Sequence, residues 1–254
     1  TYSVNAGFSV PGVVTGKPIE LGGSLGRTSA TGDGVAISTI EALRVKGIDP
    51  KNATVAIQGF GKVGYWAAIA LENMGLKVVA VSDVKGGVKG FKSITELWDY
   101  FQANGNLNAP GTDKLTQEEL LHLDVDVLIP AALADSITEK TATGIKAKII
   151  VEGANAPTTP GGDAIINDKG ILVVPDILAN SGGVIVSYFE WVQDKQNYFW
   201  TADEVKSNLN DIMMRSFKEV EEMAKSKKVS WREAAHMIGV SRVAEAHRLR
   251  GLYP

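Results

Sequence analysis

Residues 54–66 read TVAIQGFGKVGYW, and this stretch decides the fold class. It opens as an apolar run rich in β-branched residues, which is typical of a buried strand. Three glycines spaced as G-x-G-x-x-G follow at 59–64, and the apolar residues beyond them are spaced as in a helix. A strand that turns through glycines directly into a helix is typical of an open α/β sheet.

Comparable apolar runs recur along the chain and alternate with helical patterns. Because these runs are apolar throughout, we expect strands covered on both faces, as in a parallel sheet. The predicted strands are residues 54–58, 77–83, 125–130, 147–153 and 170–176. The helices predicted between them are residues 63–74, 93–102, 117–123, 137–145 and 163–168. The sequence therefore predicts a doubly wound (Rossmann-type) α/β fold, with a mostly parallel sheet and helices on both faces.

Helical patterns also precede and follow this alternation. Residues 29–46 predict a helix ahead of the first strand. Thr201 and Glu204 form a capping-box pattern at the start of a long amphipathic helix, and a last helix is predicted at 230–249. The fold should therefore end in a C-terminal helical segment without further strands.

Composition narrows the class of protein. Of the 254 residues, 44% are hydrophobic, which is enough for a buried core. The net charge of −3, without a long run of one sign, argues against binding to nucleic acid or to a membrane surface. The absence of cysteine excludes disulfides and thiolate ligands, and we expect no metal site and a cytoplasmic protein without membrane spans. Because the first residue is Thr1 rather than Met, we expect a piece of a longer protein.

The glycine turn has the context that a dinucleotide site requires. Gly59 permits the tight turn, Gly61 lets a pyrophosphate approach the backbone, and Gly64 allows close packing of helix on strand. The N-terminus of the helix then offers N–H groups to the phosphates. The alternative is an ordinary glycine-rich turn. The predicted pyrophosphate-binding residues are Gly59, Phe60, Gly61, Lys62, Val63 and Gly64.

Asp83 at the end of the second predicted strand indicates which dinucleotide binds. A carboxylate at this place accepts hydrogen bonds from the hydroxyls of the adenosine ribose and repels a 2′-phosphate. The position therefore favours NAD over NADP. Lys85 and Lys89 lie close by in the sequence and could offset that repulsion, although solvated loop charges are the simpler interpretation.

Several long segments resemble glutamate dehydrogenases over nearly the whole chain. They are GVVTGKPIELGGSLGRTSATGDGV (12–35), VAIQGFGKVG (55–64), VVAVSD (78–83), DVLIPAAL (126–133), VEGANAPTTP (151–160), VVPDILANSGGVIVSYFEWVQ (173–193) and VAEAHRLRGLYP (243–254). The resemblance implies a two-domain enzyme with the cofactor on the C-terminal domain and the amino acid in the cleft between the domains.

The resemblance also implies roles for individual cofactor-binding residues. Thr31, in an A-T-G turn, matches the residue that holds the nicotinamide carboxamide, and Arg27 precedes it. Ala131 and Ala132 match the loop that passes over the adenosine side.

Two asparagines match residues at the nicotinamide end. These are Asn155 in E-G-A-N and Asn180 in L-A-N-S-G-G, each expected just after the carboxyl end of a strand, where open α/β sheets bind ligands. An asparagine can donate and accept hydrogen bonds at once, as a carboxamide or a ribose requires. The alternative is that each asparagine only caps a turn.

Thr15, Val184 and Ser187 match the family's positions around the substrate side chain. A hydroxyl at Ser187 can bind a distal carboxylate, which favours glutamate over leucine-like substrates. The alternative is a helix serine that bonds to its own backbone.

The family's catalytic lysine and aspartate belong to a substrate domain that these 254 residues do not match, so we expect no catalytic residue in this chain. Lys17 belongs to the interdomain loop. We divide the chain into an interdomain segment (1–26), a dinucleotide-binding domain (27–190) and C-terminal helices (191–254) that reach toward the absent domain.

The expected function follows from this division. The parent should be a homo-oligomeric enzyme that oxidatively deaminates L-glutamate to 2-oxoglutarate and ammonia, with this chain binding the nucleotide but not turning over alone. Another amino-acid dehydrogenase, or an NAD-binding module without chemistry, is the alternative. Apolar surface on the first 20 residues and the C-terminal helices should be left exposed, or be buried by a second copy of the chain.

Overall fold

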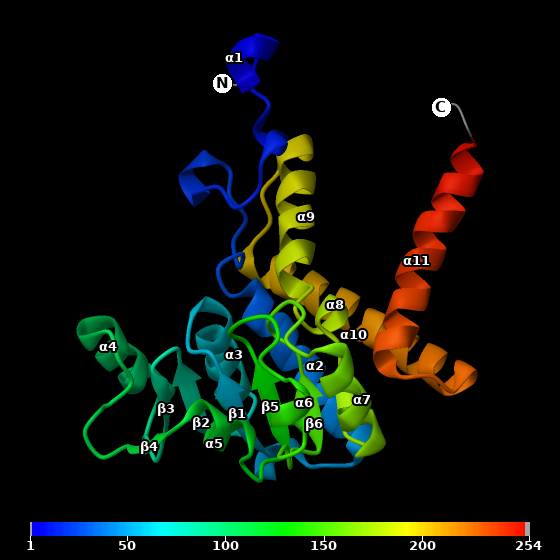
Figure 1. Cartoon of the computed structure of the whole chain (residues 1–254). Coiled ribbons are helices and arrows are strands. Elements are labelled where there is room, and N and C mark those ends of the chain that lie inside the picture. Colours follow the sequence, from blue (N-terminus) through cyan, green and yellow to red (C-terminus); the bar gives the residue numbers. More distant parts are fainter. Residues whose placement is uncertain (1, 252–254) are drawn as a thin grey trace.

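Strand β1 (Thr54–Gln58) lies in the middle of a seven-stranded sheet whose order is β4-β3-β2-β1-β5-β6-β7 (Figure 1). The computed structural model describes residues 2–251. Strands β2, β1, β5, β6 and β7 are parallel, and the chain moves from one side of β1 to the other between β2 and β5. Ligands of open α/β sheets bind at such a switch point, at the carboxyl ends of the strands.

All five predicted strands are present, and the doubly wound α/β fold is confirmed. Three of them are shorter than predicted: only the central residues of 147–153 and 170–176 form strands, and the strand predicted at 125–130 starts at Val127. The parallel strands after β1 are β2 (Lys77–Asp83), β5 (Val127–Pro130), β6 (Ile149–Val151) and β7 (Leu172–Val174).

Two further strands were missed. β3 (Gly86–Lys89) and β4 (Asp113–Leu115) extend the sheet beyond β2 as an antiparallel edge. β3 contains adjacent glycines and β4 is exposed and charged, so neither carries the apolar run by which buried strands are recognised.

Helices cover both faces of the sheet, as predicted. The long ones are α2 (Ala30–Lys46), α3 (Lys62–Asn73), α4 (Ile94–Asn104), α7 (Pro160–Asp168), α9 (Gly182–Gln196), α10 (Ala202–Lys227) and α11 (Trp231–Arg250). The short ones are α1 (Tyr2–Ala6), α5 (Gln117–Leu121), α6 (Glu139–Ala142), α8 (Asp176–Ala179) and the 3₁₀ turns η1 (Pro11–Val13), η2 (Ile19–Leu21) and η3 (Pro50–Asn52).

The bounds predicted for the helix at 137–145 are wrong, since α6 covers only Glu139–Ala142. Ile137 instead forms an isolated parallel bridge with Thr158, donating its N–H to Pro157 and accepting from the N–H of Thr159. This extended pairing delays the start of α6 to Glu139.

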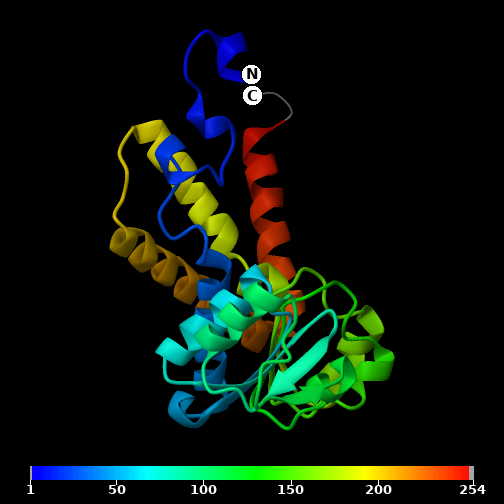
Figure 2. The same cartoon turned by 90° about the vertical axis from the view of Figure 1, so that its left-hand side faces the viewer.

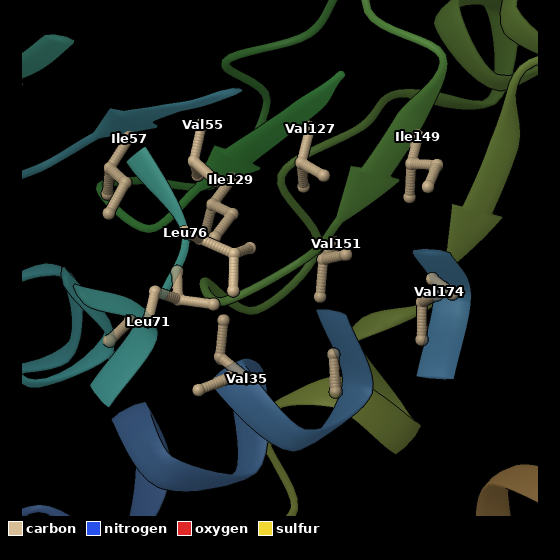
Figure 3. Close-up of a cluster of buried hydrophobic side chains, with 14 of the residues drawn as sticks. Val35, Val55, Ile57, Leu71, Leu76, Val127, Ile129, Ile149, Val151 and Val174 are labelled. Carbon is tan, nitrogen blue, oxygen red and sulfur yellow. The ribbon is translucent and has the colours of Figure 1, made fainter. Parts of the chain in front are cut away.

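The pleat of the sheet divides its side chains between two cores. Val55 and Ile57 point to the face covered by α2, α3, α10 and α11, whereas Ala56 points to the face covered by α5, α6 and α7. Figure 3 shows the first of these cores, in which Val35 of α2 and Leu71 of α3 lie against the aliphatic side chains of the strands. Complete burial of strands on both faces explains their continuous apolar runs.

α9 and α11 extend from the body of the molecule on the same side, with residues 2–21 beside α9 (Figures 1 and 2). Exposed apolar side chains lie on the first 20 residues, among them Val4 and Phe8, and on α11, among them Val240 and Val243. Apolar surface is therefore exposed in both predicted regions, and α9 adds Val184 and Tyr188. The last three residues of the 243–254 motif, like Thr1, lie outside the described residues. No helix within residues 2–251 is both long and apolar enough to cross a membrane.

Candidate functional site

The glycine turn joins β1 to α3 at the centre of the sheet's carboxyl edge. Gly59 has a φ of +100°, and a Cβ on it would lie 2.7 Å from the carbonyl oxygen of Ala131. A Cβ on Gly64 would collide with the carbonyl oxygen of Gly59. A Cβ on Gly61, by contrast, would meet no heavy atom of the described residues within 4 Å. The fold itself therefore requires glycine at 59 and 64, whereas Gly61 leaves its backbone open to a ligand.

The three other residues of the turn contribute differently. The ring of Phe60 is 1% exposed and lies edge-on to Trp98 at 5.5 Å, so it belongs to the core. Val63 is partly buried against the same core, and Lys62 is exposed at the first position of α3. A ligand would therefore contact Phe60 and Val63 through their backbone atoms.

A cavity of 630 Å³ lies beside this turn. The cavity joins the turn to Asp83 and to Ala131 and Ala132, three parts of the chain that the sequence predicted to share one site. Its other walls come from Phe101, Gly105 and residues 133–136. The cavity is lined by Gln58, Gly59, Phe60, Gly61, Asp83, Val84, Lys85, Phe101, Gly105, Gln117, Ala131, Ala132, Leu133, Ala134, Asp135 and Ser136.

Asp83 lies at the end of β2 with its carboxylate held by the following turn. Its Oδ1 accepts from the backbone N–H of Lys85 at 2.7 Å and of Gly86 at 3.2 Å. The Lys85 ammonium donates to the carbonyl of Gly105 at 2.7 Å, across the mouth of the cavity. Lys89 is exposed on β3 and does not line the cavity. Of the two lysines considered above, only Lys85 is placed to face a ribose or a phosphate.

Two predicted cofactor-binding residues and one predicted substrate-binding residue lie where α2 crosses α9. The crossing is close because Gly34 and Gly182 face each other, and a Cβ on Gly182 would collide with the carbonyl of Ala30. Arg27 Nε donates to Ser187 Oγ at 2.9 Å, and Ser187 Oγ donates to the carbonyl of Gly183 at 3.0 Å. The backbone bond considered as the alternative for Ser187 is therefore present, together with a cation at the same hydroxyl.

Thr31 lies at the same crossing. Its hydroxyl is so close to Gly183 that a Cβ there would collide with it. The structure thus brings Arg27 and Thr31, both predicted to bind the cofactor, next to Ser187, which was predicted to bind substrate.

Asn155 and Asn180 are joined directly. Asn180 Nδ2 donates to Asn155 Oδ1 at 2.7 Å and approaches the carbonyl of Gly153 at 3.4 Å. Asn155 follows β6 as expected, but Asn180 is separated from β7 by α8. The pair forms because α8 turns the chain back toward the loop after β6.

A buried ionic cluster supports the loop that carries Asn155. Glu152, whose side chain is fully buried, accepts from both terminal nitrogens of Arg232 at 2.7 and 2.9 Å and from Thr158 Oγ1 at 2.7 Å. Arg232 also donates to Asp163, while Asp176 Oδ2 accepts from the N–H of Ala156 at 2.7 Å. Burial alone would lower the pKa of Arg232, but the bonds and attraction of these carboxylates raise it above its usual value.

A second ionic cluster attaches the N-terminal segment to α9. Lys17 Nζ lies 2.6 Å from Glu190 and 2.7 Å from Asp194, and Glu190 also accepts from the N–H of Gly16. Burial would raise the pKa of Glu190, but the hydrogen bonds from Lys17 and Gly16 outweigh it and hold that pKa below its usual value. The exposed Thr15 is thereby fixed beside α9, which also carries the exposed Val184.

A second cavity of 570 Å³ lies between α2, α3 and α10. None of the predicted site residues lines it. The convergence of the predicted residues, rather than cavity size, therefore identifies the carboxyl edge of the sheet as the candidate site.

The family model for glutamate/leucine/phenylalanine/valine dehydrogenases matches residues 22–251. The chain belongs to this dehydrogenase family. Among curated proteins, it is 52% identical to a glutamate dehydrogenase of Thermotoga maritima, a match that covers 100% of this chain and 62% of that protein. It is 47% identical to the cryptic catabolic NAD-specific glutamate dehydrogenase of Bacillus subtilis, covering 98% of this chain and 59% of the relative.

Solved structures of the family agree. The hetero-hexameric glutamate dehydrogenase of Thermus thermophilus, in a leucine-bound form, superposes with a TM-score of 0.93 at 37% identity, covering 100% of this chain and 61% of that one. The chain thus spans about three fifths of the length of the dehydrogenases that it matches.

Several residues that bear on the site of this member of the dehydrogenase family were missed from sequence. Phe101 and Gln117 line the cavity, and Glu152 and Arg232 anchor the Asn155 loop. Gln117 follows a helix-capping threonine and was interpreted only as the start of a helix. A glutamate directly after an apolar strand was the one available signal for Glu152, because a buried carboxylate needs a cation.

Proposed function

We propose that this chain is the cofactor-binding part of an NAD-dependent glutamate dehydrogenase, whose parent enzyme oxidatively deaminates L-glutamate to 2-oxoglutarate and ammonia. The observation that carries the proposal is the open backbone at Gly61, between two glycines that the fold requires and beside a 630 Å³ cavity that contains Asp83. A pyrophosphate needs such an approach to the N-terminus of α3.

In this proposal, different residues of the chain bind different parts of the cofactor. The N–H groups at the start of α3 hold the pyrophosphate, and Asp83 accepts from the hydroxyls of the adenosine ribose. Thr31, Asn155 and Asn180 hold the nicotinamide end, where the bound cofactor supplies the hydride acceptor. The residues present fit NAD, because a carboxylate faces the cavity. A 2′-phosphate would meet like charge at Asp83, and several relatives are named NAD-specific.

Arg27 and Ser187 offer the substrate side a cation and a hydroxyl in direct contact. A distal carboxylate suits that pair, which supports glutamate as the substrate. Thr15 and Val184 would border the same side chain. The groups that bind the α-carboxylate and move protons would come from outside these residues, since the chain spans only about 60% of its relatives.

The domain division stays part of the proposal, with 1–26 as interdomain segment, 27–190 as cofactor domain and 191–254 as helices that reach the substrate domain. The boundary at 190 falls inside α9, so that helix would belong to both parts. A homo-oligomeric parent and a cytoplasmic location, expected from sequence, also stay proposals.

Isothermal titration of the chain with NAD tests the proposal. We expect binding by the parent chain, loss of about tenfold or more in affinity for Gly61→Ala, and no change for Gly239→Ala, whose site is likewise open but lies on α11. NAD and glutamate mixed with the chain should give no absorbance of reduced nicotinamide. Absence of NAD binding, or equal affinity in the two alanine variants, would contradict the proposal.

A further inference from the structure

The cavity contains a side chain to which neither the motif nor the family comparison assigns a role. Gln117 is the first residue of α5, which follows the antiparallel edge β3–β4 rather than a parallel strand. A capping box between Thr116 and Glu119 fixes the start of this helix, with bonds of 2.7 and 3.1 Å. The edge of the sheet thus delivers Gln117 to the wall of the cavity next to Asp83.

The hydrogen bonds around Gln117 determine which way its amide points. Its Oε1 accepts from Ser82 Oγ at 3.1 Å and lies 3.5 Å from Gln58 Nε2. The backbone carbonyl of Asp83 on the other side can only accept a hydrogen bond, so the amide nitrogen lies on that side and Oε1 faces Ser82 and Gln58. On that side, Gln117 Nε2 donates to the backbone carbonyl of Asp83.

Asp83 is therefore held from two directions. The N–H groups of Lys85 and Gly86 bind Oδ1 of its side chain, and Gln117 binds its carbonyl. A 2′-phosphate could enter only if this residue moved aside, whereas two ribose hydroxyls need the carboxylate where it is. The amide of Gln117 opposes that movement.

Gln58 belongs to the same group of side chains. It is 6% exposed and lines the cavity, and its Nε2 lies 3.5 Å from Gln117 Oε1. The amide of Gln117 is therefore enclosed by Ser82, Gln58 and the carbonyl of Asp83.

We propose that Gln117 is a positioning residue that holds Asp83 for the adenosine ribose and thereby sets the preference for a dinucleotide without a 2′-phosphate. This inference rests on the proposed function. Ser82 acts through Gln117, because its fully buried hydroxyl orients the amide.

Titration calorimetry of the chain with NAD and with NADP tests the inference. Gln117→Met keeps the length of the side chain but loses the donor, and should weaken NAD about threefold to tenfold while NADP changes less, so that the ratio of the two affinities falls. Ser82→Ala should lower the ratio by a smaller factor. Gln102→Met, on the exposed side of α4, is the matched control and should leave the ratio unchanged.

The possible outcomes separate the inference from the proposed function. A lowered NAD-to-NADP ratio in Gln117→Met, with the control unchanged, supports the inference. Equal weakening of both nucleotides means that Gln117 has only a structural role, and an unchanged variant means that it has none; either result overturns the inference alone. Absence of NAD binding by the parent chain overturns the proposed function and the inference with it. Thermal denaturation of each variant identifies misfolding, and Ser82→Ala, a smaller change, then provides the test.

Discussion

Replacing Arg232 with methionine tests the energetics of the buried cluster most directly. Arg232 makes two hydrogen bonds to the fully buried Glu152 and two to Asp163, and it belongs to the first turn of α11. Methionine fills a similar space but leaves Glu152 as a buried charge without its cation. The change therefore removes one partner of a buried pair while retaining the other.

The expected loss of stability depends on the hydrogen bonds that Glu152 retains in the variant. Breaking a buried ion pair in this way costs about 3–5 kcal/mol. Glu152 retains Thr158 Oγ1 at 2.7 Å and the N–H of Asp176 at 3.0 Å, which continue to stabilise its charge. We therefore expect about 3 kcal/mol of destabilisation. The double variant Glu152→Gln with Arg232→Met should recover about 2 kcal/mol, because the stranded charge is gone.

Urea denaturation followed by circular dichroism and tryptophan fluorescence gives the free energies of unfolding. Arg242→Met is the control, since Arg242 also lies on α11 but pairs with Glu219 at an exposed site, where at most about 1 kcal/mol is at stake. A lower m-value, the slope of the free energy of unfolding against urea concentration, would show that α11 unfolds separately from the rest of the chain. A loss below about 1 kcal/mol, or a double variant as unstable as Arg232→Met, would refute the reasoning.

Three further predictions concern other parts of the chain. The pKa of Glu190 is lowered in the folded state, so the stability that its charge contributes is present above its ordinary pKa of 4.5 and is lost as the pH falls through the folded value. The urea midpoint of the chain should therefore decline below about pH 4.5. Glu190→Gln should make that decline less steep. Gly64→Ala should lose about 3 kcal/mol of stability in the same assay, because its Cβ meets the carbonyl of Gly59, whereas Gly61→Ala should stay within about 1 kcal/mol of the parent chain. In the full-length enzyme, Ser187→Ala should raise the KM for glutamate about fivefold with a smaller effect on kcat, and the exposed Ser226→Ala should change neither; an unchanged KM would remove Ser187 from the substrate site.

The positions of strands could be predicted where a strand is buried on both faces. Val55 and Ile57 enter one core and Ala56 the other, so the three central residues of β1 had to be apolar. The edge strands β3 and β4 escaped prediction because they are short and carry no apolar run: Val88, buried in the core, stands alone between glycines and Lys89, and β4 is mostly charged. The helix that starts at Gln117 was predicted, but its contact with Asp83 was missed because it joins residues 34 positions apart.

The fold class and the glycine turn could be predicted from local sequence, since both depend on residues that are neighbours in the chain. Gly59, Gly61 and Gly64 differ in what surrounds them, but their spacing alone indicated a strand, a turn and a helix. Contacts between distant groups became visible only in the folded chain. Arg232 reaches Glu152 across 80 residues, Lys17 reaches Glu190 across 173, and Arg27 reaches Ser187 across 160. Such pairs depend on how helices cross and how far strands extend, and local spacing carries no information about either.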